Sequence, residues 1–188
     1  MDHQSHYIEL KAIPQVDMLQ SEVVSYAMQI LHKYLPHFDG RIGISFPAYG
    51  LGRTLGGIIR LFGNQEDIQV LQNALMQSDL ENYVLISDAI KTPEIIEYRC
   101  YSRFQRKGQS AIRRAKKRLT EQHKWSEQVE QNMLNKQEQQ DFLPHIHLKS
   151  ATTKQNFILS VKVTVKHKAY IGEFSTYGLS SEATVPHF

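Results

Sequence analysis

Apolar residues in roughly the first 90 positions switch between a period of two and a period of about 3.6, the side-chain repeats of a strand and a helix. The order is strand, helix, strand, strand, helix, strand. This order predicts the split βαβ arrangement of a ferredoxin-like, RRM-like domain, a fold that many unrelated activities share. The expected strands are 6–13, 41–46, 57–62 and 82–87, and the expected helices are 19–35 and the segment after Asn64.

The ends of the two helices carry recognisable signals. Pro36 and Gly40 are expected to close the first helix, because neither residue continues a helix well. Asn64, with Asp67 three residues later, is typical of a helix N-cap. The apolar stripe expected on the first helix consists of Val23, Val24, Ala27, Ile30, Leu31 and Tyr34.

The second half of the chain is more polar. Residues 91–93 (KTP) are the expected junction, which divides the chain into domains at 1–92 and 93–188. The expected elements after it are strands at 95–105, 145–150, 156–167 and 172–180, a basic helix near 111–119 and a Gln-rich helix around 126–140. The chain is thus expected to be an α+β protein, a ferredoxin-like domain followed by a smaller α+β domain that carries the basic helix.

Positive charge is concentrated in one segment. The chain has 22 Lys plus Arg and 19 Asp plus Glu, and nine of the basic residues lie between Arg99 and Thr120, where there is no acid. The rest of the chain therefore carries a net charge of about −6. A cationic stripe on an acidic body is the electrostatic pattern of a site for a polyanion. The nine residues are Arg99, Arg103, Arg106, Lys107, Arg113, Arg114, Lys116, Lys117 and Arg118.

Helical geometry separates this segment into two faces. At about 100° per residue, Ala111, Ile112, Ala115 and Leu119 share one face, and the five cations from Arg113 to Arg118 spread over the other. A solvated surface helix usually mixes signs, since like charges three or four residues apart repel each other. A helix lying on a membrane needs larger apolar residues than two alanines. Nucleic acid is the favoured partner.

Several other classes of site find little support. The loop 50–57 (GLGRTLGG) lacks the spacing and the Lys-Ser/Thr pair of a phosphate-binding loop. His145 and His147 share one side of a strand, yet only Asp141 lies nearby to complete a zinc site, so no metal is expected. No small-molecule cofactor is expected either. Cys100 alternates with Tyr98 in a strand pattern, which favours a packed thiol over a nucleophile.

The apolar segments and the cysteine count of the chain indicate the cellular compartment in which it works. No segment approaches the ~20 apolar residues of a membrane span, and the N-terminal MDHQSHYIEL has no apolar run of signal-peptide length. A single cysteine cannot form an intramolecular disulfide, which is typical of a protein in a reducing compartment. We therefore expect a cytoplasmic protein that does not associate with membranes.

The C-terminal run 175–188 (STYGLSSEATVPHF) resembles the CRISPR-associated endoribonucleases of subtype I-F, which cut precursor CRISPR RNA at each repeat hairpin. Other stretches agree with this family in order and spacing. They are the MDH start before an early strand, ILHKYL, RIGISFP, SRFQ followed by a basic helix, and LKSATTKQNF. The resemblance thus covers nearly the whole chain.

The resemblance implies three catalytic residues. The family's histidine lies in a Leu-His pair of the first helix, which matches His32. Its serine precedes a hydroxyl-rich turn, which matches Ser150, and the tyrosine before Gly-Leu-Ser, which supports the histidine, matches Tyr177. RNA carries its own nucleophile, the 2′-hydroxyl, so no metal is required. A histidine, whose ordinary pKa is about 6.5, suits the transfer of the proton from this hydroxyl. The products would be a 2′,3′-cyclic phosphate and a 5′-hydroxyl.

The resemblance also implies the RNA contacts. Arg103 and Gln105 match the residues that recognise purine bases at the hairpin foot, and Phe157 matches the aromatic residue that stacks on the closing base pair. The basic helix would follow the backbone in the deep, narrow major groove of the hairpin. The remaining expected contacts are Thr152, Arg113, Arg114, Lys117 and Arg118. Two departures stand out: Thr120 begins a polar run where the family tends to continue with arginine, and His187 replaces its usual tryptophan.

The implied partners are the CRISPR repeat hairpin, which stays bound after cleavage as the mature crRNA, and the other protein subunits of a type I-F surveillance complex. Two alternatives remain open. A non-catalytic hairpin-binding subunit would keep the RNA contacts without the cleavage, although retention of His32, Ser150 and Tyr177 together argues against it. A metal-dependent nuclease would need a cluster of carboxylates, which the sequence does not provide.

Overall fold

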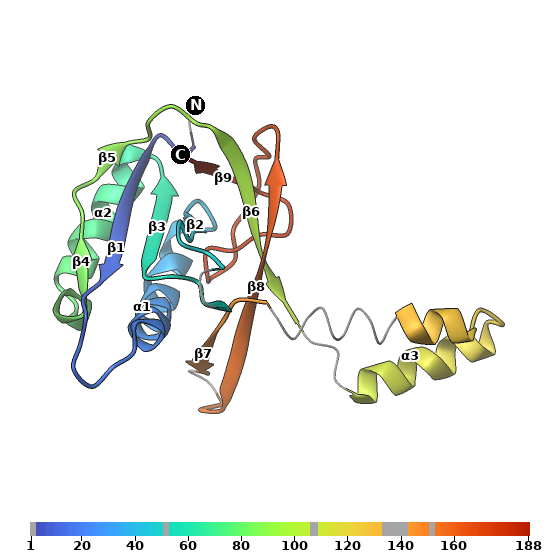
Figure 1. The fold of residues 1–188 in the computed structure, drawn as a ribbon. Helices are drawn as coiled ribbons and strands as arrows, with labels where there is room; N and C mark the ends of the chain where they lie inside the picture. Colours follow the sequence, from blue (N-terminus) through green and yellow to red (C-terminus); the bar gives the residue numbers. More distant parts are fainter. Residues whose placement is uncertain (1–2, 51–52, 106–108, 133–142, 151–152) are drawn as a thin grey trace.

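The computed structural model describes residues 3–50, 53–105, 109–132, 143–150 and 153–188 of the chain. Its elements form two antiparallel sheets (Figure 1). They are β1 (His6–Ala12), α1 (Gln20–Tyr34), η1 (Leu35–Phe38), β2 (Gly43–Ser45), β3 (Ile58–Gly63), α2 (Gln65–Met76), η3 (Asp79–Asn82), β4 (Val84–Ile86), β5 (Ile90–Lys91), β6 (Glu97–Phe104), α3 (Gln109–Glu121), β7 (His145–Lys149), β8 (Asn156–Lys166) and β9 (Val185–His187). The expected α+β class is confirmed.

The first sheet has the strand order β2-β3-β1-β4, with the two-residue strand β5 paired to the far end of β1. All of its pairings are antiparallel, and Ile8 of β1 lies opposite Leu61 of β3. Together with α1 and α2, this order confirms the ferredoxin-like β-α-β-β-α-β arrangement. Its expected strands are present: β1, β2 and β4 are shorter than expected, β3 is shifted by one residue, and β5 was not expected.

Apolar periodicity explains how α1 packs. Val23, Val24, Ala27 and Leu31 are each at most 2% exposed, and they lie in one buried cluster with Ile8 and Leu10 of β1. Alternation along β1 places Tyr7 and Glu9 on the opposite face of the sheet from these residues. The stripe expected on the first helix is therefore its core face, except that Tyr34 is only half-buried.

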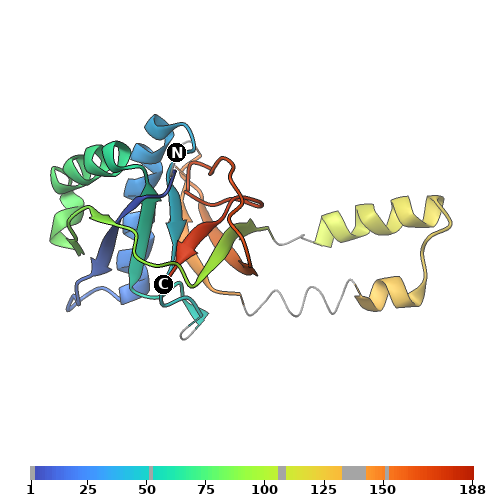
Figure 2. The same ribbon diagram turned by 90° about the horizontal axis from the view of Figure 1, so that it is seen from above.

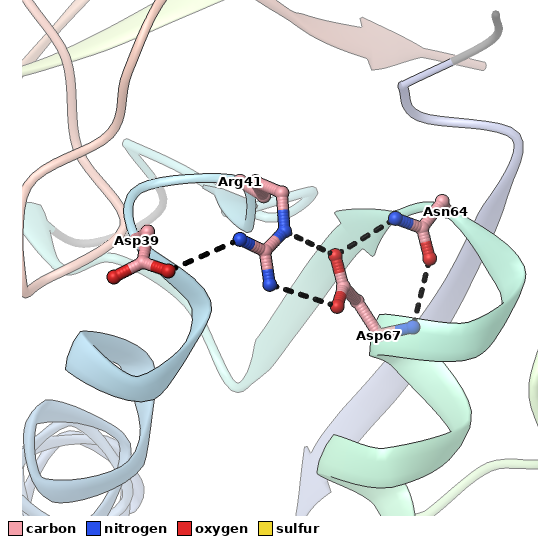
Figure 3. Close-up of polar contacts among 4 residues, drawn as sticks. All are labelled: Asp39, Arg41, Asn64 and Asp67. Atoms are coloured by element: carbon pink, nitrogen blue, oxygen red, sulfur yellow. Dashed lines mark hydrogen bonds and ion pairs between the residues drawn. The ribbon is translucent and has the colours of Figure 1, made fainter.

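A polar network fixes the start of α2, as the sequence predicts. Asn64 Oδ1 accepts the Asp67 backbone N–H at 2.8 Å, which confirms the N-cap. Arg41, in the turn before β2, donates to both carboxylate oxygens of Asp67 at 2.8 and 3.2 Å (Figure 3). Such a bidentate pair adds geometric definition to the contact between the two segments.

The second sheet has the order β7-β8-β6-β9. One prediction in this half was wrong, because residues 172–180 are not a strand. Ser175 to Gly178 instead form a tight turn: the Gly178 N–H donates to the Ser175 carbonyl at 2.7 Å, and Gly178 has a φ of +69° that favours glycine. The strand of this region is β9, which pairs with β6.

Both sheets contribute to one hydrophobic core. Leu159 and Val161 of β8 are fully buried in the same cluster as Leu10 and Leu61 of the first sheet. At the C-terminus, the Phe188 ring lies 5.1 Å from the Tyr7 ring, and the guanidinium of the buried Arg60 lies 3.9 Å from the Phe188 centroid. The first sheet lies within residues 1–92 and the second within 93–188, and the division into two domains stays a prediction.

The basic helix is present as α3, and residues 127–132 form a further helical stretch. Figures 1 and 2 show both standing away from the two sheets. Among the described residues, no helix is long and apolar enough to cross a membrane.

Candidate active site

The turn at Ser175–Gly178 meets the C-terminal half of α1 at His32. This half-buried histidine lies on the flank of the helix beside the core face. Its Nδ1 lies 3.1 Å from the carbonyl oxygen of Thr176. A carbonyl only accepts hydrogen bonds, so Nδ1 carries the hydrogen and donates. In the neutral imidazole this leaves a lone pair on Nε2, the nitrogen available to take a proton.

Tyr177, from the same turn, stacks on the His32 ring. The two ring centroids are 4.1 Å apart and the ring planes differ by 2°. Burial raises the pKa of the Tyr177 phenol above its ordinary value, and the positive charge of Arg103 opposes this rise. Tyr177 is therefore a neutral phenol at physiological pH, and its ring restricts how the imidazole can turn.

Gly178 explains why this turn has a fixed position. A Cβ atom at Gly178 would collide with the Ile44 side chain of β2, and the Ile44 N–H donates to the Gly178 carbonyl at 2.9 Å. Only glycine allows the turn to approach β2 this closely. The close approach holds Thr176 and Tyr177 against α1.

Ser150 lies immediately after β7, at the start of a turn. Its Oγ accepts the Thr153 N–H at 3.1 Å, and its own N–H donates to the Gln155 carbonyl at 2.9 Å. One lone pair of Oγ is thus occupied, while its O–H can donate to a ligand. Gln29 of α1 donates from Nε2 to the Lys149 carbonyl at 3.3 Å, which places this turn beside the helix of His32. The described residues show no hydrogen bond between Ser150 and His32.

Phe157 and Arg103 extend the row of side chains beyond Tyr177. The Phe157 ring lies 6.5 Å from the Tyr177 ring at 73°, an edge-on arrangement. The Arg103 guanidinium lies 5.6 Å from the Phe157 centroid, within the range of a cation–π contact. Four side chains that are distant in the sequence therefore form one contiguous row, and Gln105 follows β6 as an exposed residue near its end.

The cations of α3 are exposed. Arg113, Arg114, Lys117 and Arg118 all face solvent on α3, which stands away from the two sheets (Figures 1 and 2). Lys116 is exposed as well, and its ammonium contacts Glu130 at 2.9 Å and the Trp125 ring at 4.8 Å. The structure does not bring the α3 cations to His32. Thr152 lies outside the described residues.

The sequence offered two further candidate sites, the histidine pair His145 and His147 and the thiol of Cys100. The His145 and His147 rings lie 5.6 Å apart, and the described residues contain no group of three or more His, Cys, Asp or Glu that could hold a metal. Asp141 lies outside the described residues. Cys100 is buried, which confirms a packed side chain, and burial raises the pKa of its thiol.

Three features of the site were missed from the sequence: the Thr176 carbonyl, the packing of Gly178 on Ile44, and the contact of Gln29. A backbone carbonyl has no sequence signal of its own. Gln29 could have been noticed, because it precedes His32 by three residues and so lies on a neighbouring part of the helix surface.

Comparison with known proteins finds one family along nearly the whole chain. The family model described as CRISPR-associated protein (Cas_Csy4) matches residues 7–188. A curated relative in Escherichia coli (strain UTI89 / UPEC), the CRISPR-associated endonuclease Cas6/Csy4, is 32% identical over 189 residues, which covers 97% of this chain and 99% of that protein. Both matches include α1, β7, β8 and the turn at Ser175–Gly178.

Proposed function

Because the chain belongs to the Cas_Csy4 family of CRISPR-associated proteins, we propose that it is a metal-independent endoribonuclease that cleaves CRISPR precursor RNA at the base of the repeat hairpin. The observation that carries this proposal is the fixed imidazole of His32. Its Nδ1 donates to a carbonyl and its ring is stacked on Tyr177, so Nε2 is prepared to accept a proton. An oriented base of this kind suits RNA, which brings its own nucleophile.

The reaction transfers one proton and exchanges one phosphorus–oxygen bond for another. His32 Nε2 takes the proton of the 2′-hydroxyl next to the scissile phosphate. The 2′-oxygen then bonds to phosphorus and the bond from phosphorus to the 5′-oxygen breaks. The leaving 5′-oxygen takes up a proton from water, and the His32 imidazolium returns its proton to water. The products are a 2′,3′-cyclic phosphate and a 5′-hydroxyl.

Ser150 would hold the attacking group in line. Its Oγ already accepts the Thr153 N–H, and its O–H is left to donate a hydrogen bond to a ligand. A hydrogen bond from this O–H to the 2′-oxygen would fix the angle of attack, and correct orientation supplies a large part of such a rate enhancement.

The row beyond Tyr177 would bind the foot of the hairpin. Phe157 offers a ring on which the closing base pair can stack, and Arg103 and Gln105 carry the donors that recognise purine edges. The exposed cations of α3 would contact phosphates along the major groove, and cleavage at the foot leaves these contacts in place, so the product hairpin stays bound. The proposed phosphate and turn contacts are Arg113, Arg114, Lys117, Arg118 and Thr152.

The second candidate is a hairpin-binding subunit of a type I-F CRISPR surveillance complex that does not cut. The exposed α3 and the row at Phe157 would serve such a subunit equally well. The stacked and hydrogen-bonded His32 favours the enzyme, because binding alone does not require an oriented imidazole. In either case we propose that other subunits of the complex are protein partners and that the protein acts in the cytoplasm.

Two substrates separate these functions. A repeat hairpin should be cleaved in EDTA, and the same hairpin with a 2′-deoxy nucleotide just upstream of the cut should bind without being cleaved. The all-RNA hairpin in magnesium is the control. Cleavage that requires the metal would indicate a metal-dependent nuclease, and cleavage of the 2′-deoxy hairpin or a 5′-phosphate on the product would show attack by water. Binding without cleavage of either RNA would favour the non-catalytic subunit.

A further inference from the structure

His32 and Ser150 belong to different elements, which meet directly where α1 packs on β7. His32 lies near the end of α1, and Ser150 follows the last residue of β7. Any sliding or rotation of the helix against the strand would therefore change the position of the imidazole relative to the serine hydroxyl. What holds the helix in register on the strand is thus part of the active-site geometry.

Apolar packing alone defines this register poorly. Ile146 and Leu148 of β7 are each 2% exposed and share a buried cluster with Met28 and Leu31 of α1. These contacts keep the two elements together, but the hydrophobic effect is not directional. A small shift along the helix axis would cost little buried area.

Gln29 supplies a directional contact at the critical point. Its Nε2 donates to the Lys149 carbonyl at 3.3 Å, the single side-chain hydrogen bond between α1 and β7 among the described residues. The donor is three residues before His32, and the acceptor is the residue directly before Ser150. The turn at Ser150 is braced by its own hydrogen bonds to Thr153 and Gln155, so it moves with Lys149.

We propose that Gln29 is a positioning residue for the cleavage reaction: its amide holds the end of β7 on α1, and so sets His32 against Ser150. This inference rests on the proposed endoribonuclease function. Gln29 lies outside the row at Phe157 and Arg103 that would hold the hairpin foot, so its loss changes the geometry of the reaction without changing hairpin binding. A misplacement of about 1 Å at an active site lowers a rate by up to about 10²-fold.

Three substitutions of Gln29 isolate the role of its donor. Gln29→Met keeps the length of the side chain and removes the donor, and Gln29→Glu keeps the shape and replaces the donor with an acceptor. Gln29→Lys restores a donor of similar reach. Ser25→Ala is the matched control, because Ser25 lies one turn earlier on α1 and its hydroxyl donates to Ser21 of its own helix at 2.9 Å.

For each variant we would measure the single-turnover cleavage rate at saturating protein, the Kd for the 2′-deoxy hairpin, and the Tm. We expect Gln29→Met and Gln29→Glu to cut about 10-fold to 10²-fold more slowly, with Kd within about twofold of wild type, and Gln29→Lys to recover most of the rate. Ser25→Ala should match wild type. Unchanged rates, a parallel loss of binding, or a fall in Tm that accounts for the lost rate would each overturn the proposal. Failure of the wild-type protein to cut would instead refute the endoribonuclease function itself.

Discussion

At the scale of single residues, His32 combines two constraints on one ring. The Thr176 carbonyl occupies Nδ1, and the Tyr177 ring covers one face of the imidazole. Each constraint removes freedom that a solvent-exposed histidine keeps, namely the choice of tautomer and the rotation of the ring. The remaining nitrogen, Nε2, is the group that the proposed mechanism uses.

His32→Ala should therefore abolish most cleavage and leave hairpin binding nearly intact. Loss of general acid–base catalysis typically costs about 10²- to 10⁴-fold in rate. Single-turnover cleavage and equilibrium binding would be measured side by side, with His37→Ala as the control, because His37 is an exposed histidine just beyond the same helix. A mutant that cuts at the wild-type rate would exclude His32 as the base.

At the scale of secondary structure, α3 differs from α1 and α2 in what it packs against. The apolar faces of α1 and α2 are buried in the common core, whereas α3 stands away from both sheets (Figure 1). Lys116 forms an ion pair with Glu130 and a cation–π contact with Trp125, both in the segment that follows α3. Arg113, Arg114, Lys117 and Arg118 are exposed, and we propose that these cations contact RNA phosphates.

Replacing Arg114, Lys117 and Arg118 together with alanine should weaken hairpin binding and reduce its salt dependence. Each phosphate contact contributes about 0.7–0.9 to the slope of log K against log salt, so the slope should flatten by up to about two to three units. Binding would be measured at several salt concentrations against a control variant with the same net charge, in which the exposed Lys11, Lys91 and Lys168 become alanine. A slope like that of the control would mean that α3 does not contact the RNA backbone.

At the scale of the whole molecule, the core joins the two sheets that the sequence assigns to separate domains. Leu159 of β8 is fully buried among residues of both sheets. The C-terminal Phe188 adds a second connection through Tyr7 and Arg60 of the first sheet. The proposed domains 1–92 and 93–188 therefore share a core and should unfold together.

Leu159→Ala should lower the free energy of unfolding by about 2–5 kcal/mol, the usual cost of this truncation in a core. Urea unfolding followed by both tyrosine fluorescence and far-UV circular dichroism should show one shifted transition. Ile158→Ala is the control, since Ile158 is the neighbouring residue and is 47% exposed on the other face of the strand. Two separate transitions, with only one of them shifted, would indicate domains that unfold independently.

Much of the fold was determined by local pattern. The alternating residues of β1 and the 3.6-residue stripe of α1 bury their apolar sides, and Asn64 caps α2, because each of these features acts within a few residues of the chain. The charge of α3 is equally local. The sequence by itself therefore predicted the order of elements in the first sheet and the basic helix, and its resemblance to a known family predicted which residues to examine.

The geometry of the site was decided only by the tertiary structure. His32 meets Thr176 across 144 positions of the chain, and nothing in the local pattern of residues 172–180 distinguished a turn from the expected strand. That turn exists because Gly178 can pack directly on Ile44, a contact made by two segments that the sequence places far apart. Long-range packing of this kind chooses which backbone groups meet a side chain, and so the carbonyl that orients the His32 imidazole could be found only once the two sheets were assembled.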